Sequence, residues 1–155
     1  MMKPTYRMLA AIPAALAISA TAAAADFEAG QIWSAIGRVK DPDPQVLVLR
    51  VERETPVGDV VFVAAGGVKL CLPNGACGDT FSPLAMSKDA LERSVKTLLN
   101  TLPVPAAVQN NPKYQLEKGY LGWKDGIAQG ARVTITVPLA EALDEIEGGA
   151  KIQVK

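Results

Sequence analysis

The first 25 residues of this 155-residue chain decide which part of it is available for folding. Lys3 and Arg7 give a positively charged start, residues 8–20 form an apolar stretch, and three alanines stand directly before Asp26. The apolar stretch is about 13 residues long, whereas a membrane-spanning helix needs about 20. We therefore predict a cleaved signal peptide over residues 1–25 and a bacterial protein that is periplasmic or secreted.

The predicted mature chain, residues 26–155, is nearly neutral. Cleavage removes Lys3 and Arg7, so 14 of the 16 lysine and arginine residues remain against 16 aspartate and glutamate residues. Nucleic-acid binding needs a clustered basic face, and we expect no nucleic-acid partner. The length fits a single domain with an ordinary core, and we expect no stable membrane span once the signal is removed.

The predicted compartment determines how the two cysteines, Cys71 and Cys77, are interpreted. An oxidising compartment favours a disulfide over a metal site or a reactive thiol. Pro73, Asn74 and Gly75 lie between them and favour a turn, because proline presets φ while asparagine and glycine tolerate positive φ. We predict a structural Cys71–Cys77 disulfide. The alternative, a redox-active pair, lacks the close C-x-x-C spacing.

The chain contains no histidine. This excludes histidine-dependent triads, Cys-His pairs and imidazole zinc sites. Carboxylate, lysine or tyrosine chemistry remains, but no spacing identifies a pair of catalytic carboxylates. We expect no enzyme activity, no catalytic residue, no cofactor and no metal site. The acidic residues near the C-terminus fit the solvated face of a short helix: Glu141, Asp144, Glu145 and Glu147.

The first half of the mature chain has the pattern of strands. Alternating or β-branched residues recur between loop segments rich in proline, aspartate and glycine. Gly66 and Gly67 are predicted to form a tight turn, because both residues can adopt positive φ. The predicted strands are residues 31–36, 45–52, 57–64 and 68–71.

The second half changes to a helical period. Ser87 is a predicted N-cap for a helix over residues 87–99, and Asn111 for a second helix over residues 111–130. In the second helix Leu116, Tyr120, Trp123 and Ile127 form an apolar stripe, although its three internal glycines weaken this prediction. A strand over 132–137, a helix over 138–146 and an extended tail over 151–154 complete the predicted order.

This order predicts an α+β fold: a mostly antiparallel sheet of four to five strands with two to three helices packed on one face. Three segments also carry a resemblance: GQIWS at residues 30–34, PLAMSKDALERSVKTL at 83–98, and GYLGWKDGIAQGARVTITVPLAEALDEIE at 119–147. Together they resemble a family of small bacterial proteins of unknown function, which share GQ-W-S, S-x-x-AL-x-x-SV and GY-x-x-W segments. The resemblance implies one α+β domain and supplies no activity.

Four aromatic residues allow two interpretations: Trp33, Tyr114, Tyr120 and Trp123. The first is core packing, because tryptophan and tyrosine bury large areas. The second is an exposed interaction patch, because the same residue types are enriched at interface hot spots.

Three hypotheses of function follow from export, small size and the lack of histidine. The first is a noncatalytic protein-binding or inhibitor module, for example an immunity protein, whose partner is a periplasmic or secreted protein. The second is a protein that binds a small molecule or a cell-envelope ligand between sheet and helices, which predicts an apolar pocket. The third is a carboxylate-dependent envelope hydrolase, which needs two acidic residues in one cleft and a perturbed pKa.

Overall fold

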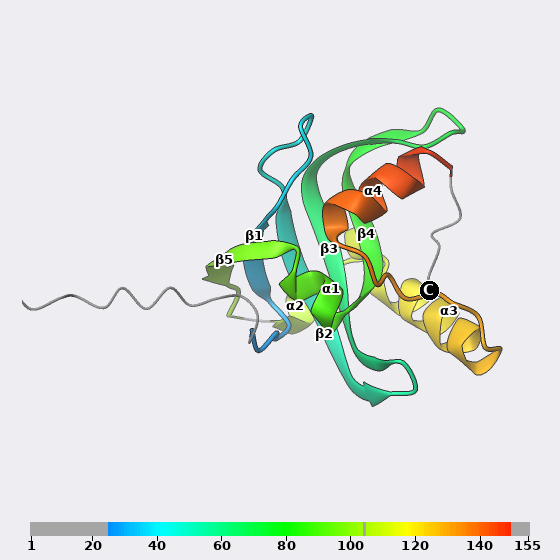
Figure 1. The fold of residues 1–155 in the computed structure, drawn as a ribbon. Helices are drawn as coiled ribbons and strands as arrows, with labels where there is room; N and C mark the ends of the chain where they lie inside the picture. The colour runs from blue at the N-terminus through cyan, green and yellow to red at the C-terminus, as the bar shows by residue number, and fades with distance from the viewer. Residues whose placement is uncertain (1–24, 104, 150–155) are drawn as a thin grey trace, which may run out of the picture.

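A computed structural model describes residues 25–103 and 105–149, so most of the predicted signal peptide and the predicted tail over 151–154 lie outside the described residues. A five-stranded antiparallel sheet in the order β4-β3-β2-β1-β5 forms the centre of the fold (Figure 1). The strands are β1 (Gln31–Ala35), β2 (Gln45–Thr55), β3 (Gly58–Cys71), β4 (Cys77–Ser87) and β5 (Val95–Thr101). The helices are α1 (Lys88–Glu92), α2 (Pro105–Gln109), the 3-10 helix η2 (Pro112–Tyr114), α3 (Leu116–Ala128) and α4 (Leu139–Glu147).

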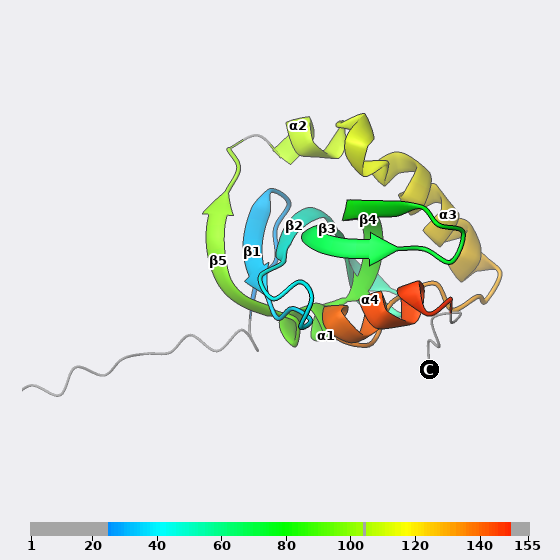
Figure 2. The same ribbon diagram turned by 90° about the horizontal axis from the view of Figure 1, so that it is seen from above.

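The predicted α+β fold class is confirmed, but the helices cover both faces of the sheet instead of one. Viewed from above, α1 and α4 lie on one side of the strands and α2 and α3 on the other (Figure 2). Each side has its own apolar cluster. The first cluster joins Leu91 and Leu143 to strand residues such as Val61, and the second joins Trp123 to Phe62. Neighbouring residues of β3 therefore pack into different clusters, because side chains point alternately to the two faces of a strand.

The predicted turn at Gly66 and Gly67 is wrong, because β3 runs without interruption through both glycines to Cys71. Gly67 does adopt positive φ, at +70°, but it does so within an irregular stretch where the register with β4 shifts between Gly66 and Leu70. A bulge uses the same backbone freedom as a turn, so the glycine pair did not distinguish between them. The chain reverses instead at the disulfide loop, and β4, which the sequence pattern did not predict, follows it.

The predicted helix over 87–99 is correct only in its first half. Ser87 caps α1 as expected, since its Oγ accepts a hydrogen bond from the Ala90 N–H at 3.2 Å. The helix ends at Glu92, and Val95 begins β5, where it pairs with Ala35 of β1. Pairing with the edge of β1 overrides the local helical period, because strand formation depends on the available neighbours more than helix formation does.

The predicted helix over 111–130 is divided at Gln115, which adopts a left-handed conformation with φ of 49°. Asn111 caps the short helix η2 before this point, and α3 follows it with 13 residues. The predicted apolar stripe is confirmed, since all four of its residues belong to the second cluster. Gly119 is required for close packing: a Cβ there would lie 2.1 Å from the Pro83 Cγ of β4.

The predicted strand over 132–137 is wrong, because only Ile135 makes a bridge, in parallel with Met86 of β4. The chain pairs with β4 at this one residue and then begins α4. The predicted helix over 138–146 is confirmed as α4, which is followed by Gly148 and Gly149. Within the described ranges, no helix is long and apolar enough to cross a membrane.

Candidate functional site

The predicted disulfide between Cys71 and Cys77 is present, and it closes the hairpin between β3 and β4. The loop has the turn hydrogen bonds that its sequence predicts. The Leu72 N–H donates to the Ala76 carbonyl at 2.8 Å, the Ala76 N–H donates to Asn74 Oδ1 at 3.0 Å, and the intervening glycine adopts positive φ. The cystine is therefore a staple across an exposed hairpin end.

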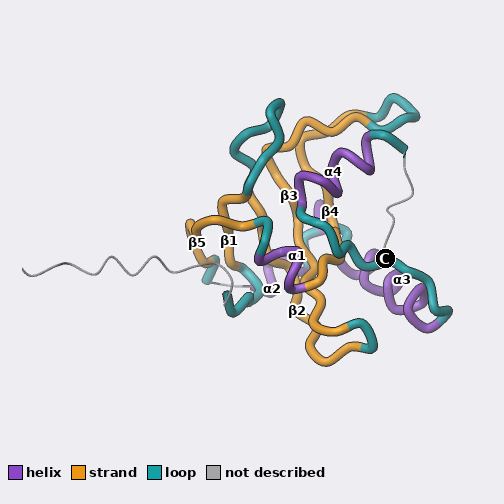
Figure 3. The backbone as a smooth tube through the Cα atoms, viewed as in Figure 1, coloured by secondary structure: helices purple, strands orange, loops and turns teal. Residues whose placement is uncertain are grey.

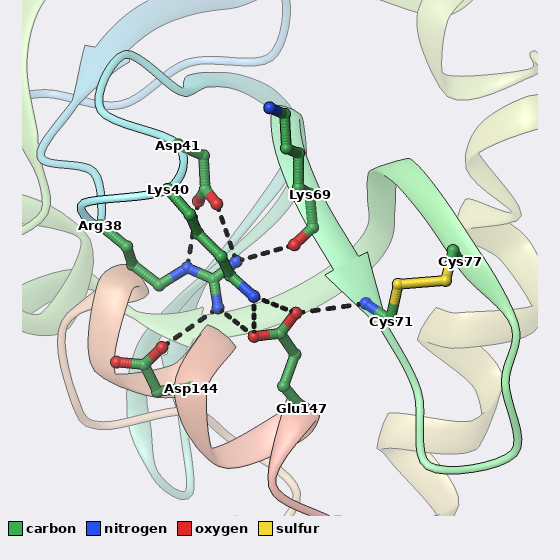
Figure 4. A network of polar contacts seen from close by, with 8 residues as sticks. All are labelled: Arg38, Lys40, Asp41, Lys69, Cys71, Cys77, Asp144 and Glu147. Atoms are coloured by element: carbon green, nitrogen blue, oxygen red, sulfur yellow. Dashed lines mark hydrogen bonds and ion pairs between the residues drawn. A yellow bond between two sulfur atoms is a disulfide. The ribbon is translucent and has the colours of Figure 1, made fainter.

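The most concentrated group of charges surrounds Arg38, whose side chain is only 5% exposed (Figure 4). Its Nε and Nη2 donate to the two oxygens of Asp41, each at 3.0 Å. Its Nη1 donates to Asp144 Oδ1 at 3.1 Å and to Glu147 Oε2 at 2.7 Å, while Nη2 also reaches the Lys69 carbonyl at 3.1 Å. Every nitrogen of the guanidinium thus donates to a protein acceptor.

Glu147 connects this group to the disulfide hairpin. Its carboxylate binds Lys40 and Arg38 and accepts a hydrogen bond from the Cys71 backbone N–H at 3.2 Å. Together these donors lower the pKa of Glu147 to about 2, and the hydrogen bond from Lys40 makes the largest contribution to this shift. Burial disfavours the charged form of Arg38, but the hydrogen bonds to its carboxylate partners outweigh this and raise the pKa of Arg38.

We call Arg38, Lys40, Asp41, Asp144 and Glu147 the Arg38 network. The expected solvated face holds for Asp144, whose side chain is 68% exposed although its Oδ1 binds Arg38. It is wrong for Glu147, whose side chain is 18% exposed and binds Arg38 from α4. The network joins the loop between β1 and β2 to α4 and the disulfide hairpin. The carboxylates of the network bind cationic side chains. The pKa of Glu147 is lowered, whereas a general acid needs a raised pKa. The described part of the chain contains no group of three or more acidic or cysteine residues placed to hold a metal ion.

The structure separates the four aromatic residues of the predicted interaction patch. Trp33 packs against the first cluster, where its ring meets Phe27 edge-on at 5.5 Å between centroids. Tyr114, Tyr120 and Trp123 belong to the second cluster, on the other face of the sheet. Trp123 is buried, and its Nε1 donates to Thr134 Oγ1 at 2.9 Å. Trp33 therefore does not share a surface with the other three, and core packing describes Trp123 best.

Figure 3 shows the turn that joins β2 to β3 at the end of the molecule opposite the hairpin of β3 and β4. A groove lies between this turn and the connection from α3 to α4. We call it the hairpin groove. Its volume is about 360 Å³, and its walls are mainly apolar. Val57 from the turn is 48% exposed and Val133 from the connection is 38% exposed. The lining also includes Pro56, Ile127, Arg132 and Thr134.

The connection that forms one wall of the hairpin groove is held at several points. Val133 packs on Gly126 of α3 so closely that a Cβ on that glycine would lie 2.8 Å from Val133 Cγ1. Thr134 receives the hydrogen bond from Trp123, and Ile135 exchanges backbone hydrogen bonds with β4, each at 2.8 Å. These contacts fix the wall in one position, so the groove exists before anything binds.

No pattern in the sequence predicts this groove. Val57 stands at the start of one predicted strand and Val133 within another, whereas the structure exposes both side chains. The two valines belong to segments far apart in the chain, and no local pattern indicates that they meet. The signal in the sequence is weak: a valine follows Pro56 between two predicted strands.

Comparison of the chain with protein-family models, with curated proteins and with solved structures gave no match.

Proposed function

We propose that this protein is a noncatalytic binding module of the bacterial periplasm and that it engages a protein partner through the hairpin groove. The observation that carries the proposal is the pairing of Val57 and Val133 as exposed apolar walls of one groove. A preformed groove with apolar walls can receive an apolar anchor side chain of a partner. An inhibitor of the immunity type is one concrete form of such a module.

The dimensions of the groove indicate the group that it receives. A volume of about 360 Å³ accommodates one large aromatic or two aliphatic side chains. A partner segment that presents an apolar anchor would complement this arrangement.

The Arg38 network supports a noncatalytic role. Asp41, Asp144 and Glu147 converge in space, as a hydrolase would require of its carboxylates, but Arg38 occupies the position between them. With its pKa lowered to about 2, Glu147 has the opposite perturbation from a proton donor that works near neutral pH. The network stabilises the fold and offers no acidic pair for envelope hydrolysis.

Two observations support export. The Cys71–Cys77 disulfide is typical of an oxidising compartment. Phe27, the second residue after the predicted cleavage point, is buried in the first cluster. Cleavage after Ala25 would keep Phe27 in the first cluster and remove only Ala25, which is partly buried against that cluster. We expect the periplasmic protein to have the mass of a chain that begins at Asp26.

The test compares two matched variants after crosslinking in the periplasm of the source bacterium. V57D places a carboxylate in the hairpin groove, while V39D makes the same change at a fully exposed valine in the loop between β1 and β2. We expect wild type and V39D to retain the same partner and V57D to retain about tenfold less of it, as loss of a central apolar anchor would produce. Equal recovery of the partner with V57D and V39D would exclude the groove as the docking site.

A further inference from the structure

A second hollow opens on the face of the sheet that carries the second cluster. Along β3 the side chains on this face shrink from Phe62 to Ala64 and then to Gly66. Ala64 and Gly66 pair in regular register with Leu47 and Gln45 of β2, and the register shifts before Phe62 is reached. Nothing lies within 4 Å of the position that a Cβ on Gly66 would occupy. The core is therefore filled at Phe62 by the aromatic residues of α3 and is open at Gly66.

We call this space the sheet hollow; its volume is about 200 Å³. The apolar part of its lining comes from Ile32, Leu47 and Ala64 of three neighbouring strands. Tyr114 and Lys113 from η2 complete it on the side away from the strands. The hollow thus lies between the sheet and a helical segment, on the face opposite α1 and α4.

The segment that carries Lys113 and Tyr114 is held in place. The Tyr114 carbonyl accepts a hydrogen bond from Ser82 Oγ of β4 at 2.8 Å, and the Tyr114 N–H donates to the Asn111 carbonyl at 3.1 Å. The Lys113 N–H donates to Asn111 Oδ1 at 3.0 Å. Because the backbone of Tyr114 is held from both sides, this segment lines the hollow without first having to be ordered.

The lining indicates a chemical class of ligand. Lys113 is the charged residue among the described residues around the hollow, and its Nζ lies 5.9 Å from the centroid of the Tyr114 ring. The bare backbone of Gly66 and the ring of Tyr114 favour a flat group, because aromatic rings pack well against both. An ammonium group at the rim favours a negative charge on that group.

We propose that the sheet hollow binds a small aromatic carboxylate, with its ring between the β3 backbone at Gly66 and the Tyr114 side chain and its carboxylate towards Lys113. A space of about 200 Å³ suits a compound of one or two rings. At the ligand efficiency of ordinary small molecules, such a compound binds with a Kd of roughly 1 mM or below. This site is separate from the hairpin groove and does not rest on the proposed protein-binding function.

The experiment is a titration of isotope-labelled mature protein with indole-3-acetate, followed by the amide signals of Ala64, Gly66 and Tyr114. We expect saturable shifts at these three positions. Tryptamine carries the same ring with a positive charge, and octanoate carries the same charge without a ring. Each should bind at least about fivefold more weakly. Absence of saturable binding of indole-3-acetate would overturn the proposal, and equal binding of either control compound would overturn the ligand class.

Two glycine variants locate the site. G66V fills the hollow from its floor, and φ at Gly66 is not in the left-handed region, so the strand tolerates valine there. G78V makes the same change on β4, outside the hollow. We expect G66V to weaken binding of indole-3-acetate at least about tenfold, K113Q about threefold, and G78V not at all. If G66V binds as wild type does, or if G78V loses binding equally, the hollow is not the site.

Discussion

Arg38 and Asp41 form a bidentate pair inside the fold: Nε and Nη2 of the arginine each lie 3.0 Å from an oxygen of the aspartate, and the two side chains are 5% and 1% exposed. A pair in this position holds the loop between β1 and β2 in a closed conformation, and Arg38 extends the contact to α4. Removing one member would leave the other charge buried without its partner, which costs far more than losing an ion pair on the surface.

We predict that R38M lowers the free energy of unfolding by about 3 to 5 kcal/mol, because Asp41 is left buried and unpaired. Urea denaturation under oxidising conditions measures this. The matched control is R53M, which breaks the exposed pair between Arg53 and Asp26 and should cost less than about 1 kcal/mol. Equal losses in the two variants would show that burial of the Arg38 network has no energetic weight.

The stability of the protein should depend on pH through Glu147. The pKa of this carboxyl group is about 2 in the folded protein, against an ordinary value of 4.5. A lowered pKa means that the ionised group stabilises the fold fully above pH 4.5 and loses this contribution as the pH falls towards 2. We expect E147Q to have a lower urea midpoint than wild type at pH 7 and the difference to shrink between pH 4.5 and 2. A difference that stays constant over that range would contradict the assignment.

Removal of the disulfide should lower the free energy of unfolding only modestly. Cys71 and Cys77 are six residues apart, and closing so short a loop contributes roughly 2 to 2.5 kcal/mol in the chain-entropy model. We expect C71S/C77S to lose about that much in urea denaturation. Reductant should lower the free energy of unfolding of wild type by the same amount and leave that of the variant unchanged. A response of the variant to reductant would show that the loss in wild type does not come from the disulfide alone.

The glycines of α3 should differ sharply in their response to alanine. A Cβ at Gly119 would lie 2.1 Å from the Pro83 ring, whereas nothing lies within 4 Å of a Cβ at Gly122. We predict that G122A stabilises the protein by up to about 1 kcal/mol through helix propensity. G119A should destabilise it, because either α3 or β4 must move. Thermal unfolding of the two variants compares them directly, and equal stabilisation would mean that α3 does not approach β4 so closely.

The features that were predictable from the sequence are those with a local cause. The stripe of Leu116, Tyr120, Trp123 and Ile127 follows the period of a helix, and the Cys71–Cys77 loop contains its own turn residues, so both predictions are confirmed. Residues 95–99 fit a helical period as well as a strand. Only the free edge of β1, which lies far away in the chain, selects the strand.

The candidate sites were less predictable because each depends on distant segments. Glu147 has the pattern of a solvated helix residue, and its contacts with Arg38 and Cys71 arise only when α4 packs across the sheet. Val57 and Val133 likewise meet only after the connection from α3 to α4 returns to β4. Of the predicted patch residues, Tyr114 does line a hollow, while Trp123 became part of the core.

If the hairpin groove receives an apolar side chain of a partner protein, a crosslinker placed in the groove should capture that partner. The most direct measurement is photocrosslinking in the periplasm from p-benzoylphenylalanine placed at position 57, with position 39 as the control in a distant exposed loop. We predict one defined protein adduct from position 57, none from position 39, and loss of the position 57 adduct when Val133 is changed to aspartate. The same adduct from both positions, or no adduct from position 57, would show that no partner docks in the hairpin groove.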